Sequence, residues 1–240
     1  MYTIGDAFLC RPEMCFSCRG KFETVKKNLL QIQEEIAPYR PKIIAVTKYF
    51  DEEAIEAAYN AGLRDFGESR AVEAVQKIKK LPEYVRSNST FHFIGHLQSN
   101  KVKKVIEVFD YIHSVDSVKL AGIISEEALN SGKIQNILLQ LNNANEIQKF
   151  GFSKEDLLES FGEIQKLEGV NISGLMNMAP LGATEDELNK LFGDVVKTKE
   201  LLEERFGCRL KEVSMGMSQD YQIAAQNGAT MLRIGRKLFS

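Results

Sequence analysis

The sequence predicts a single-domain (β/α)8 barrel (TIM barrel), an α/β fold, with one extra N-terminal helix. Three observations lead to this fold class. From about residue 40 onward, short apolar runs alternate with amphipathic helical patterns, which is typical of a parallel sheet covered by helices. Eight such runs occur, and eight is the number of strands in a closed barrel. No linker or shift in composition interrupts the alternation, so one domain accounts for it. A doubly wound open sheet would show the same alternation and is the alternative.

The expected strands are short runs rich in apolar and β-branched residues, and helical or turn-forming segments separate them. They are Lys42–Thr47, Arg64–Gly67, Phe91–Gly95, Tyr111–Ser114, Gln135–Leu141, Asn171–Met176, Glu212–Met215 and Met231–Ile234.

Between these strands, apolar residues recur at helical spacing. The expected helices are Glu52–Asn60, Ala71–Lys80, Asn100–Phe109, Ser117–Asn130, Lys154–Lys166, Glu185–Phe206 and Gln219–Asn227. Gly62, Gly207 and Gly228 follow three of them, at the position where a left-handed glycine commonly ends a helix.

An N-terminal extension, residues 1–20, precedes the barrel domain, residues 21–240. Within this domain, Phe22–Ile36 has apolar residues at helical spacing, and we expect this helix to lie against the barrel and close its bottom. The extension contains Cys10, Cys15 and Cys18. The last two have the spacing of a metal knuckle, but a structural zinc site needs four ligands and no second pair follows. We therefore expect no metal site.

The composition is that of an ordinary globular protein, with 44% hydrophobic and 27% charged residues. A formal net charge of −2 gives no electrostatic reason to expect a nucleic acid or an anionic membrane as a partner. No segment is long and apolar enough to span a bilayer, and Met1–Cys10 lacks the basic start and apolar stretch of a signal peptide. We therefore expect a cytoplasmic protein.

Lys48 directly follows the first expected strand. A lysine at the end of a buried strand lies close to the apolar interior, where desolvation favours the neutral amine over the ammonium ion. The neutral amine is the nucleophile that forms a Schiff base with an aldehyde. A lysine that only extends its side chain to solvent would occupy the same position, so this segment alone leaves both interpretations open.

Polar and glycine residues gather where the expected strands end, and barrels bind their ligands at these ends. Two of them have the features of an anion site. Gly216-Met217-Ser218 leads from a strand into a helix, whose first N–H groups favour a phosphate, with Ser218 as the expected N-cap. Gly235 and Arg236 follow the last strand, and a glycine lets the backbone approach a ligand closely. A helix cap and a simple turn would explain the two motifs equally well if each stood alone.

A lysine that forms a Schiff base and a phosphate site in one barrel favour a ligand with both an aldehyde and a phosphate. Pyridoxal 5′-phosphate (PLP) has both groups. Arg233, in the last expected strand, would then face the pyridine nitrogen of PLP. Because a guanidinium donates hydrogen bonds but accepts none, the ring nitrogen would stay unprotonated and PLP would be a weaker electron sink. An arginine paired with a neighbouring carboxylate is the alternative explanation. The predicted PLP site comprises Lys48, Met217, Ser218, Arg233, Gly235 and Arg236.

Seven motifs occur in the order found in a known family. They are Ile44–Lys48, Phe66–Glu68, Phe91–Lys101, Ile112–Asp116, Ser173–Met176, Ser214–Ser218 and Met231–Arg236. With these motifs, the sequence from about Lys42 to Phe239 resembles the pyridoxal phosphate homeostasis proteins (the YggS/PROSC group), which are related to the N-terminal barrel of alanine racemase. The extension with its cysteines is not covered by the resemblance.

The resemblance implies a (β/α)8 barrel with PLP bound to Lys48 as a Schiff base, and phosphate contacts made mostly by the backbone. It also implies a protein that carries or buffers PLP and keeps vitamin B6 and amino-acid pools in balance, with PLP-dependent apo-enzymes as recipients. Three positions depart from the family pattern, and one of them, Phe91 in place of tryptophan, is an apolar exchange of little consequence. Ser69 stands where asparagine is frequent, and Arg236 stands where threonine or alanine is frequent.

A PLP-dependent amino-acid racemase of the alanine-racemase type is the alternative function. Racemisation needs a base on each face of the cofactor, and Lys48 would supply one of them. The related racemases place the second base, a tyrosine, on a separate C-terminal domain, whereas this sequence ends at Ser240. Tyr49, Tyr221 and His96 are the nearest replacements. We therefore expect a monomeric PLP carrier without robust turnover. A lysine-dependent aldolase without PLP would leave the phosphate motifs unexplained.

Overall fold

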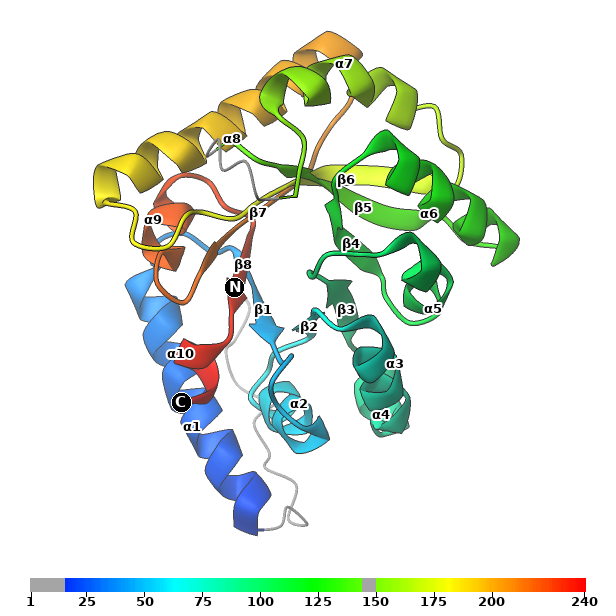
Figure 1. Ribbon diagram of the computed structural model, residues 1–240. Helices are drawn as coiled ribbons and strands as arrows, with labels where there is room; N and C mark the ends of the chain where they lie inside the picture. Colours follow the sequence, from blue (N-terminus) through cyan, green and yellow to red (C-terminus); the bar gives the residue numbers. More distant parts are fainter. Residues whose placement is uncertain (1–15, 144–149) are drawn as a thin grey trace, which may run out of the picture.

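The computed structural model describes residues 16–143 and 150–240, with side chains from residue 19 onward. At its centre is a closed barrel in which each strand pairs in parallel with the next along the chain (Figure 1). The first strand, β1 (Lys42–Val46), also pairs with the last, β8 (Met231–Ile234). This closing pair excludes a doubly wound open sheet, so the predicted barrel is confirmed.

The remaining strands lie where the sequence places them, and their ends differ from the predicted ends by at most two residues. They are β2 (Asp65–Glu68), β3 (Thr90–Phe93), β4 (Tyr111–Val115), β5 (Gln135–Leu141), β6 (Val170–Asn177) and β7 (Glu212–Met217).

Helices surround the barrel as the periodicity predicts. They are α1 (Phe16–Glu35), α2 (Glu52–Asn60), α3 (Ala71–Lys80), α4 (Glu83–Arg86), η1 (Ser99–Lys101), α5 (Val102–Ile106), α6 (Val118–Asn130), α7 (Lys154–Ile164), α8 (Glu185–Phe206), α9 (Tyr221–Gln226) and α10 (Arg236–Phe239). Gly207 ends α8 in the left-handed conformation, with φ of 61°, as predicted. The sequence did not reveal α4 and α10, because a single turn is too short to show a helical period.

Two sets of side chains fill the interior. Apolar residues on the outward face of the strands, such as Phe66 and Ile112, pack with those of the helices in one continuous core. Polar residues of distant strands meet inside the lumen: His113 on β4 lies 3.0 Å from Ser214 on β7, although these strands are not neighbours. The barrel is therefore filled by side chains, as is usual for this fold. Among the described helices, none combines the length and apolar character that crossing a bilayer requires.

Helix α1 lies at the side of the barrel and does not close its bottom. It packs against α2 and α10 (Figure 1). Asn28 on α1 donates hydrogen bonds to the carbonyl oxygens of Leu238 and Ser240, at 3.1 and 2.9 Å. Because α10 is only one turn long, α1 fills the place of a full outer helix between β8 and β1.

The N-terminal extension is described only in part. Helix α1 starts at Phe16, so the predicted boundary at residue 20 falls within a helix. Cys10, Cys15 and the side chain of Cys18 lie outside the described residues, and the expectation for these cysteines stays a prediction.

Candidate functional site

A cavity of about 440 Å³ opens at the carboxyl ends of the barrel strands. It is lined by all six residues of the predicted PLP site, namely Lys48, Met217, Ser218, Arg233, Gly235 and Arg236. These residues belong to the segment after β1, the end of β7 and the end of β8. The three segments are adjacent because β8 pairs with both β1 and β7. Ser69, one of the three departures from the family pattern, lines the same cavity.

Lys48 lies just beyond the end of β1 and is half-buried. Its Nζ is 5.1 Å from the centre of the Tyr49 ring, which is within the range of a cation–π contact. Tyr49 also lines the cavity and is 71% exposed. The amine therefore lies beside an exposed side chain of the cavity lining, and Lys48 is less deeply buried than the apolar strand before it suggested.

A buried ion pair holds the segment that carries Lys48. Lys77 on α3 pairs with Glu68 at the end of β2, and its Nζ also donates to the carbonyl oxygens of Thr47 and Phe50 at 2.8 and 2.9 Å. Thr47 Oγ1 donates to Glu68 Oε1 at 2.7 Å. The exposed fractions of the Lys77 and Glu68 side chains are 13% and 3%. Because these contacts lie on both sides of Lys48, they define the path of this segment.

Replacing Lys77 with methionine should lower the free energy of unfolding by about 3–5 kcal/mol, because the carboxylate of Glu68 would stay buried without its cation. Urea unfolding measures this loss. Lys79→Met on the same helix is the matched control. Lys79 pairs with Glu107 where both side chains are about half exposed, so its loss should cost less than about 1 kcal/mol. Equal losses in the two variants would show that the buried pair does not stabilise the fold.

Ser218 does not cap α9, and the prediction that it does is wrong. The N-cap residue of α9 is Asp220, which accepts a hydrogen bond from the backbone N–H of Met217 and so closes a turn. Ser218 Oγ instead lies 3.4 Å from the backbone nitrogens of Gly235 and Lys237 and accepts long hydrogen bonds from both. The hydroxyl of Ser218 therefore contacts the segment that follows β8 and takes no part in the start of α9.

The two glycine-containing segments meet as the sequence predicts, although their contacts differ from the expected ones. Gly216 allows the chain to turn after β7: its φ is 87°, and a Cβ there would lie 2.5 Å from Cβ of Ala224. The turn brings the Ser218 hydroxyl next to the N–H groups of Gly235 and Lys237. Grouped backbone N–H donors of this kind favour an anion such as a phosphate.

Arg233 is almost wholly buried, with 4% exposed. Its Nη1 donates to Ser214 Oγ and its Nη2 to the carbonyl oxygen of Asn177, both at 2.7 Å. Burial lowers the pKa of Arg233 to about 10, against the opposing effect of Asp220, and burial raises the pKa of the Asp220 carboxyl. Arg233 therefore remains a cation at neutral pH and presents only donors to the cavity.

The three side chains considered as a second base lie in different environments. Tyr49 lines the cavity at its exposed side, whereas Tyr221 is 3% exposed and packs in the core. His96 Nδ1 lies 3.4 Å from a carboxylate oxygen of Asp116. Of the three, only Tyr49 lines the cavity that contains Lys48.

Sequence reasoning missed the roles of Lys77, Asn177 and Asp220. Asn177 ends β6, so its position at a strand end was an available signal. Asp220 lies three residues after Met217, from whose N–H it accepts a hydrogen bond, and aspartate is a residue type whose side chain often bonds the backbone in turns. For Lys77 no such signal exists. Helix α3 also carries Lys79 and Lys80, and the sequence does not show which of the three lysines forms the buried ion pair.

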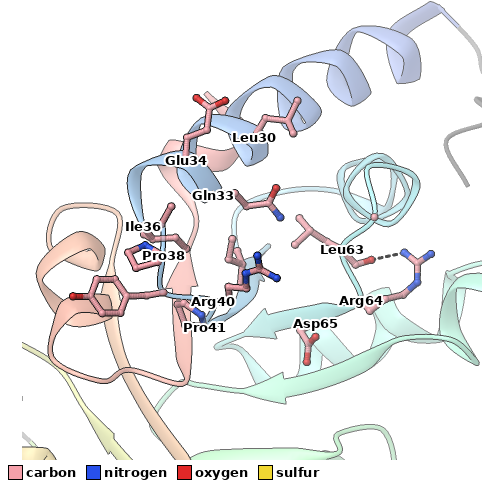
Figure 2. Close-up of a pocket in the computed structure, with 14 residues that line it drawn as sticks. Leu30, Gln33, Glu34, Ile36, Pro38, Arg40, Pro41, Leu63, Arg64 and Asp65 are labelled. Atoms are coloured by element: carbon pink, nitrogen blue, oxygen red, sulfur yellow. Dashed lines mark hydrogen bonds between the residues drawn. The ribbon is translucent and has the colours of Figure 1, made fainter. Parts of the chain in front are cut away.

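A larger cavity, about 810 Å³, lies at the opposite end of the barrel (Figure 2). It is bounded by the C-terminal half of α1 and by the starts of β1 and β2, and Arg40, Arg64 and Asp65 are among its charged residues. Arg64 is already engaged, because its Nη1 donates to the carbonyl oxygens of Tyr59 and Leu63 at 2.7 Å. Barrels of this type bind ligands at the other end, so the smaller cavity is the candidate site.

Comparison with known proteins places this chain in a family. Residues 21–240 match the family described as alanine racemase, N-terminal domain. A pyridoxal phosphate homeostasis protein of Synechocystis sp. is 41% identical over 202 residues, which are 84% of this chain and 92% of that protein. The pyridoxal phosphate homeostasis protein of Escherichia coli is 31% identical over 228 residues, which are 90% of this chain and 95% of that protein.

Solved structures show the same relationship. PipY of Synechococcus elongatus, with PLP bound, has a TM-score of 0.81 and 37% identity and covers 90% of this chain and 100% of its own. Alanine racemase of Clostridium difficile has a TM-score of 0.70 at 18% identity and covers 90% of this chain but 56% of its own, a likeness that shows the shared barrel alone. From the family match and the identities of 31–41%, the chain belongs to the alanine racemase N-terminal domain family and, within it, to the pyridoxal phosphate homeostasis proteins.

Proposed function

We propose that this protein binds PLP as a Schiff base on Lys48 and carries or buffers it for PLP-dependent enzymes, which helps to balance vitamin B6 and amino-acid pools. The observation that carries this proposal is the meeting of Lys48 with Ser218, Arg233 and Gly235 in one cavity at the carboxyl end of the barrel. The PLP-bound structure of PipY, at 37% identity, supports the same ligand.

The cavity suits PLP in size and in chemistry. Its volume of about 440 Å³ is typical of small-molecule sites. The amine of Lys48 would attack the aldehyde carbon, forming the C=N bond and releasing the carbonyl oxygen as water. Ser218 and the backbone of Gly235 and Arg236 would hold the phosphate, and Met217 would line the ring. When bound, PLP supplies an electron sink for bonds next to an amino nitrogen.

Arg233 favours holding PLP over driving a reaction on it. A buried guanidinium that faces the pyridine nitrogen cannot accept a proton from it, so the ring nitrogen stays unprotonated and withdraws electrons less strongly. The open side of the cavity agrees with this role, since Tyr49 and Leu181 there are 71% and 83% exposed. Carbanion chemistry profits from excluding water, whereas a carrier must let PLP enter and leave.

Transfer of PLP to an apo-enzyme tests this proposal. The protein loaded with PLP is mixed with the apo-form of a PLP-dependent aminotransferase, and the return of aminotransferase activity is followed over time. In parallel, the release of PLP from Lys48 is measured with a carbonyl scavenger. We expect activity to return faster than PLP is released, which would show direct transfer.

Return at the rate of PLP release would support buffering without direct transfer. If the aminotransferase stays inactive over the time in which free PLP restores it fully, both the carrier and the buffer roles are excluded.

A further inference from the structure

A chain of hydrogen-bonded side chains crosses the lumen of the barrel and ends at Arg233. It runs from Asp65 on β2 through His92 on β3, His113 on β4 and Ser214 on β7 to Arg233 on β8. The successive distances between polar atoms are 2.9, 2.9, 3.0 and 2.7 Å. The two histidines and the serine have no exposed surface. Apart from Arg233 itself, no residue of this chain of hydrogen bonds lines the candidate site.

We propose that Asp65, His92, His113 and Ser214 are positioning residues, which hold the guanidinium of Arg233 toward the ring of PLP through one directed chain of hydrogen bonds. The inference rests on the proposed function, because Arg233 would act on bound PLP.

The donor-only character of Arg233 sets the direction of every hydrogen bond in the chain. Ser214 Oγ accepts from Arg233 Nη1, so its own proton is donated to His113 Nδ1. A neutral His113 then carries its proton on Nε2 and donates it to His92 Nδ1. A neutral His92 likewise donates from Nε2 to the carboxylate of Asp65. In this order every donor between Arg233 and Asp65 has an acceptor.

The opposite order would require an additional proton. His92 would be a cation that donates to both Asp65 and His113. Ser214 Oγ would accept from His113 as well as from Arg233, and no acceptor within the chain would remain for the serine proton. Burial, together with the charges of His92, Arg233 and Lys42, holds the pKa of His113 well below its usual value, so His113 is neutral in either order. The unplaced serine proton and the need for an additional proton are what count against the opposite order.

Other titratable groups face the chain from neighbouring elements. They are Lys42, Asp110, Tyr111, Glu212 and Asp220. Lys42 Nζ lies 3.7 Å from Asp65 Oδ1, and the Tyr111 ring stacks on His92 with ring centres 5.0 Å apart. The cation of Lys42 supports a charged carboxylate on Asp65, which is the final acceptor that the directed chain needs. Asp65 also lines the larger cavity at the opposite end of the barrel (Figure 2). The chain of hydrogen bonds therefore runs from that end toward the candidate site.

Two contacts determine the orientation of Arg233. Nη2 is held by the carbonyl oxygen of Asn177 and Nη1 by Ser214, and a planar guanidinium held at both nitrogens cannot rotate. Ser214 Oγ accepts from Nη1, and in the directed chain its own proton points away from Arg233, toward His113. Loss of the serine hydroxyl would therefore free one side of Arg233, whereas a change at Asp65 would reach it only through the chain.

Nitrogen-15 NMR of the histidine rings tests the direction of the chain in the protein without PLP. The sequence contains only three histidines, and His96, with 41% of its side chain exposed, is the internal reference. We expect His92 and His113 to be neutral and protonated on Nε2 at neutral pH. A proton on Nδ1 of either ring would overturn the directed chain. Since this measurement needs no PLP, it is independent of whether the proposed function holds.

Ser214 variants test the positioning of Arg233 itself. Ser214→Ala should raise the Kd for PLP about 10- to 100-fold, as for the loss of a hydrogen bond to a charged group, and should change the absorbance of bound PLP. Ser214→Thr keeps the hydroxyl and should restore most of the affinity. Ser114→Ala is the matched control and should leave the Kd unchanged, because Ser114 Oγ is buried with no hydrogen-bond partner among the described residues.

A double-mutant cycle decides whether Ser214 acts through Arg233. In an Arg233→Met background, where the side chain can no longer donate to Ser214, Ser214→Ala should cause no further loss of PLP affinity. An equal loss with and without Arg233, or no loss in the single variant, would overturn the inference. Failure of the wild-type protein to bind PLP would instead overturn the proposed function, while the NMR result would still report the proton order.

Discussion

Lys48→Ala is expected to abolish the covalent attachment of PLP and the yellow colour that it gives the protein. Lys48 is the only lysine among the described residues that line the candidate cavity, so no second amine is in place to form the Schiff base. The absorbance band of bound PLP should disappear from the variant. Borohydride reduction of the wild-type protein followed by mass spectrometry should locate PLP on Lys48.

The effect of this substitution should be confined to the site. Lys48 is half-buried beyond the end of β1, so its loss should change the free energy of unfolding by less than about 1 kcal/mol. Lys104→Ala, at an exposed position on α5, is the control and should remain yellow. A colourless wild-type protein that fails to take up PLP, or a yellow Lys48→Ala variant, would rule out attachment at Lys48.

The barrel and the rim of the site could be predicted because both follow from local patterns. The apolar run Lys42–Thr47 and the helical period of Glu185–Phe206 are set by residues close together in the sequence. Once parallel strands close into a barrel, their carboxyl ends lie on one rim. The order of strands along the sequence therefore predicts by itself that Lys48, Ser218 and Arg233 lie on the same rim.

Contacts between distant residues could not be predicted in the same way. His113 and Ser214 are 101 residues apart, and both occupy ordinary strand positions. Ser218 has the local signature of an N-cap, but the side chain of Asp220 closes the turn and leaves the serine to meet Gly235. Which of several plausible partners a polar side chain takes depends on how the barrel brings its strands together, and short sequence windows do not contain that information.

Arg233→Glu is expected to change the absorbance of bound PLP and to destabilise the protein when PLP is not bound. Without PLP, a glutamate would face the carbonyl oxygen of Asn177 and the carboxyl of Asp220, the groups that now lie near the guanidinium. A buried charge without a partner should cost about 3–5 kcal/mol of unfolding free energy. With PLP bound, the carboxylate would accept a hydrogen bond from a protonated pyridine nitrogen, so PLP should restore part of the lost stability.

Arg233→Gln separates the effect of the new carboxylate from the loss of the arginine. Glutamine is neutral and can still donate to Ser214 or Asn177, so it should leave the ring nitrogen of PLP unprotonated. The spectra of the two variants should therefore differ across neutral pH, with the glutamate variant alone resembling PLP protonated on its ring nitrogen. Thermal unfolding with and without PLP should show the larger ligand-induced rise in Tm for Arg233→Glu. If the two variants give the same spectrum, Arg233 does not face the ring nitrogen, and its burial would serve only the packing of the lumen.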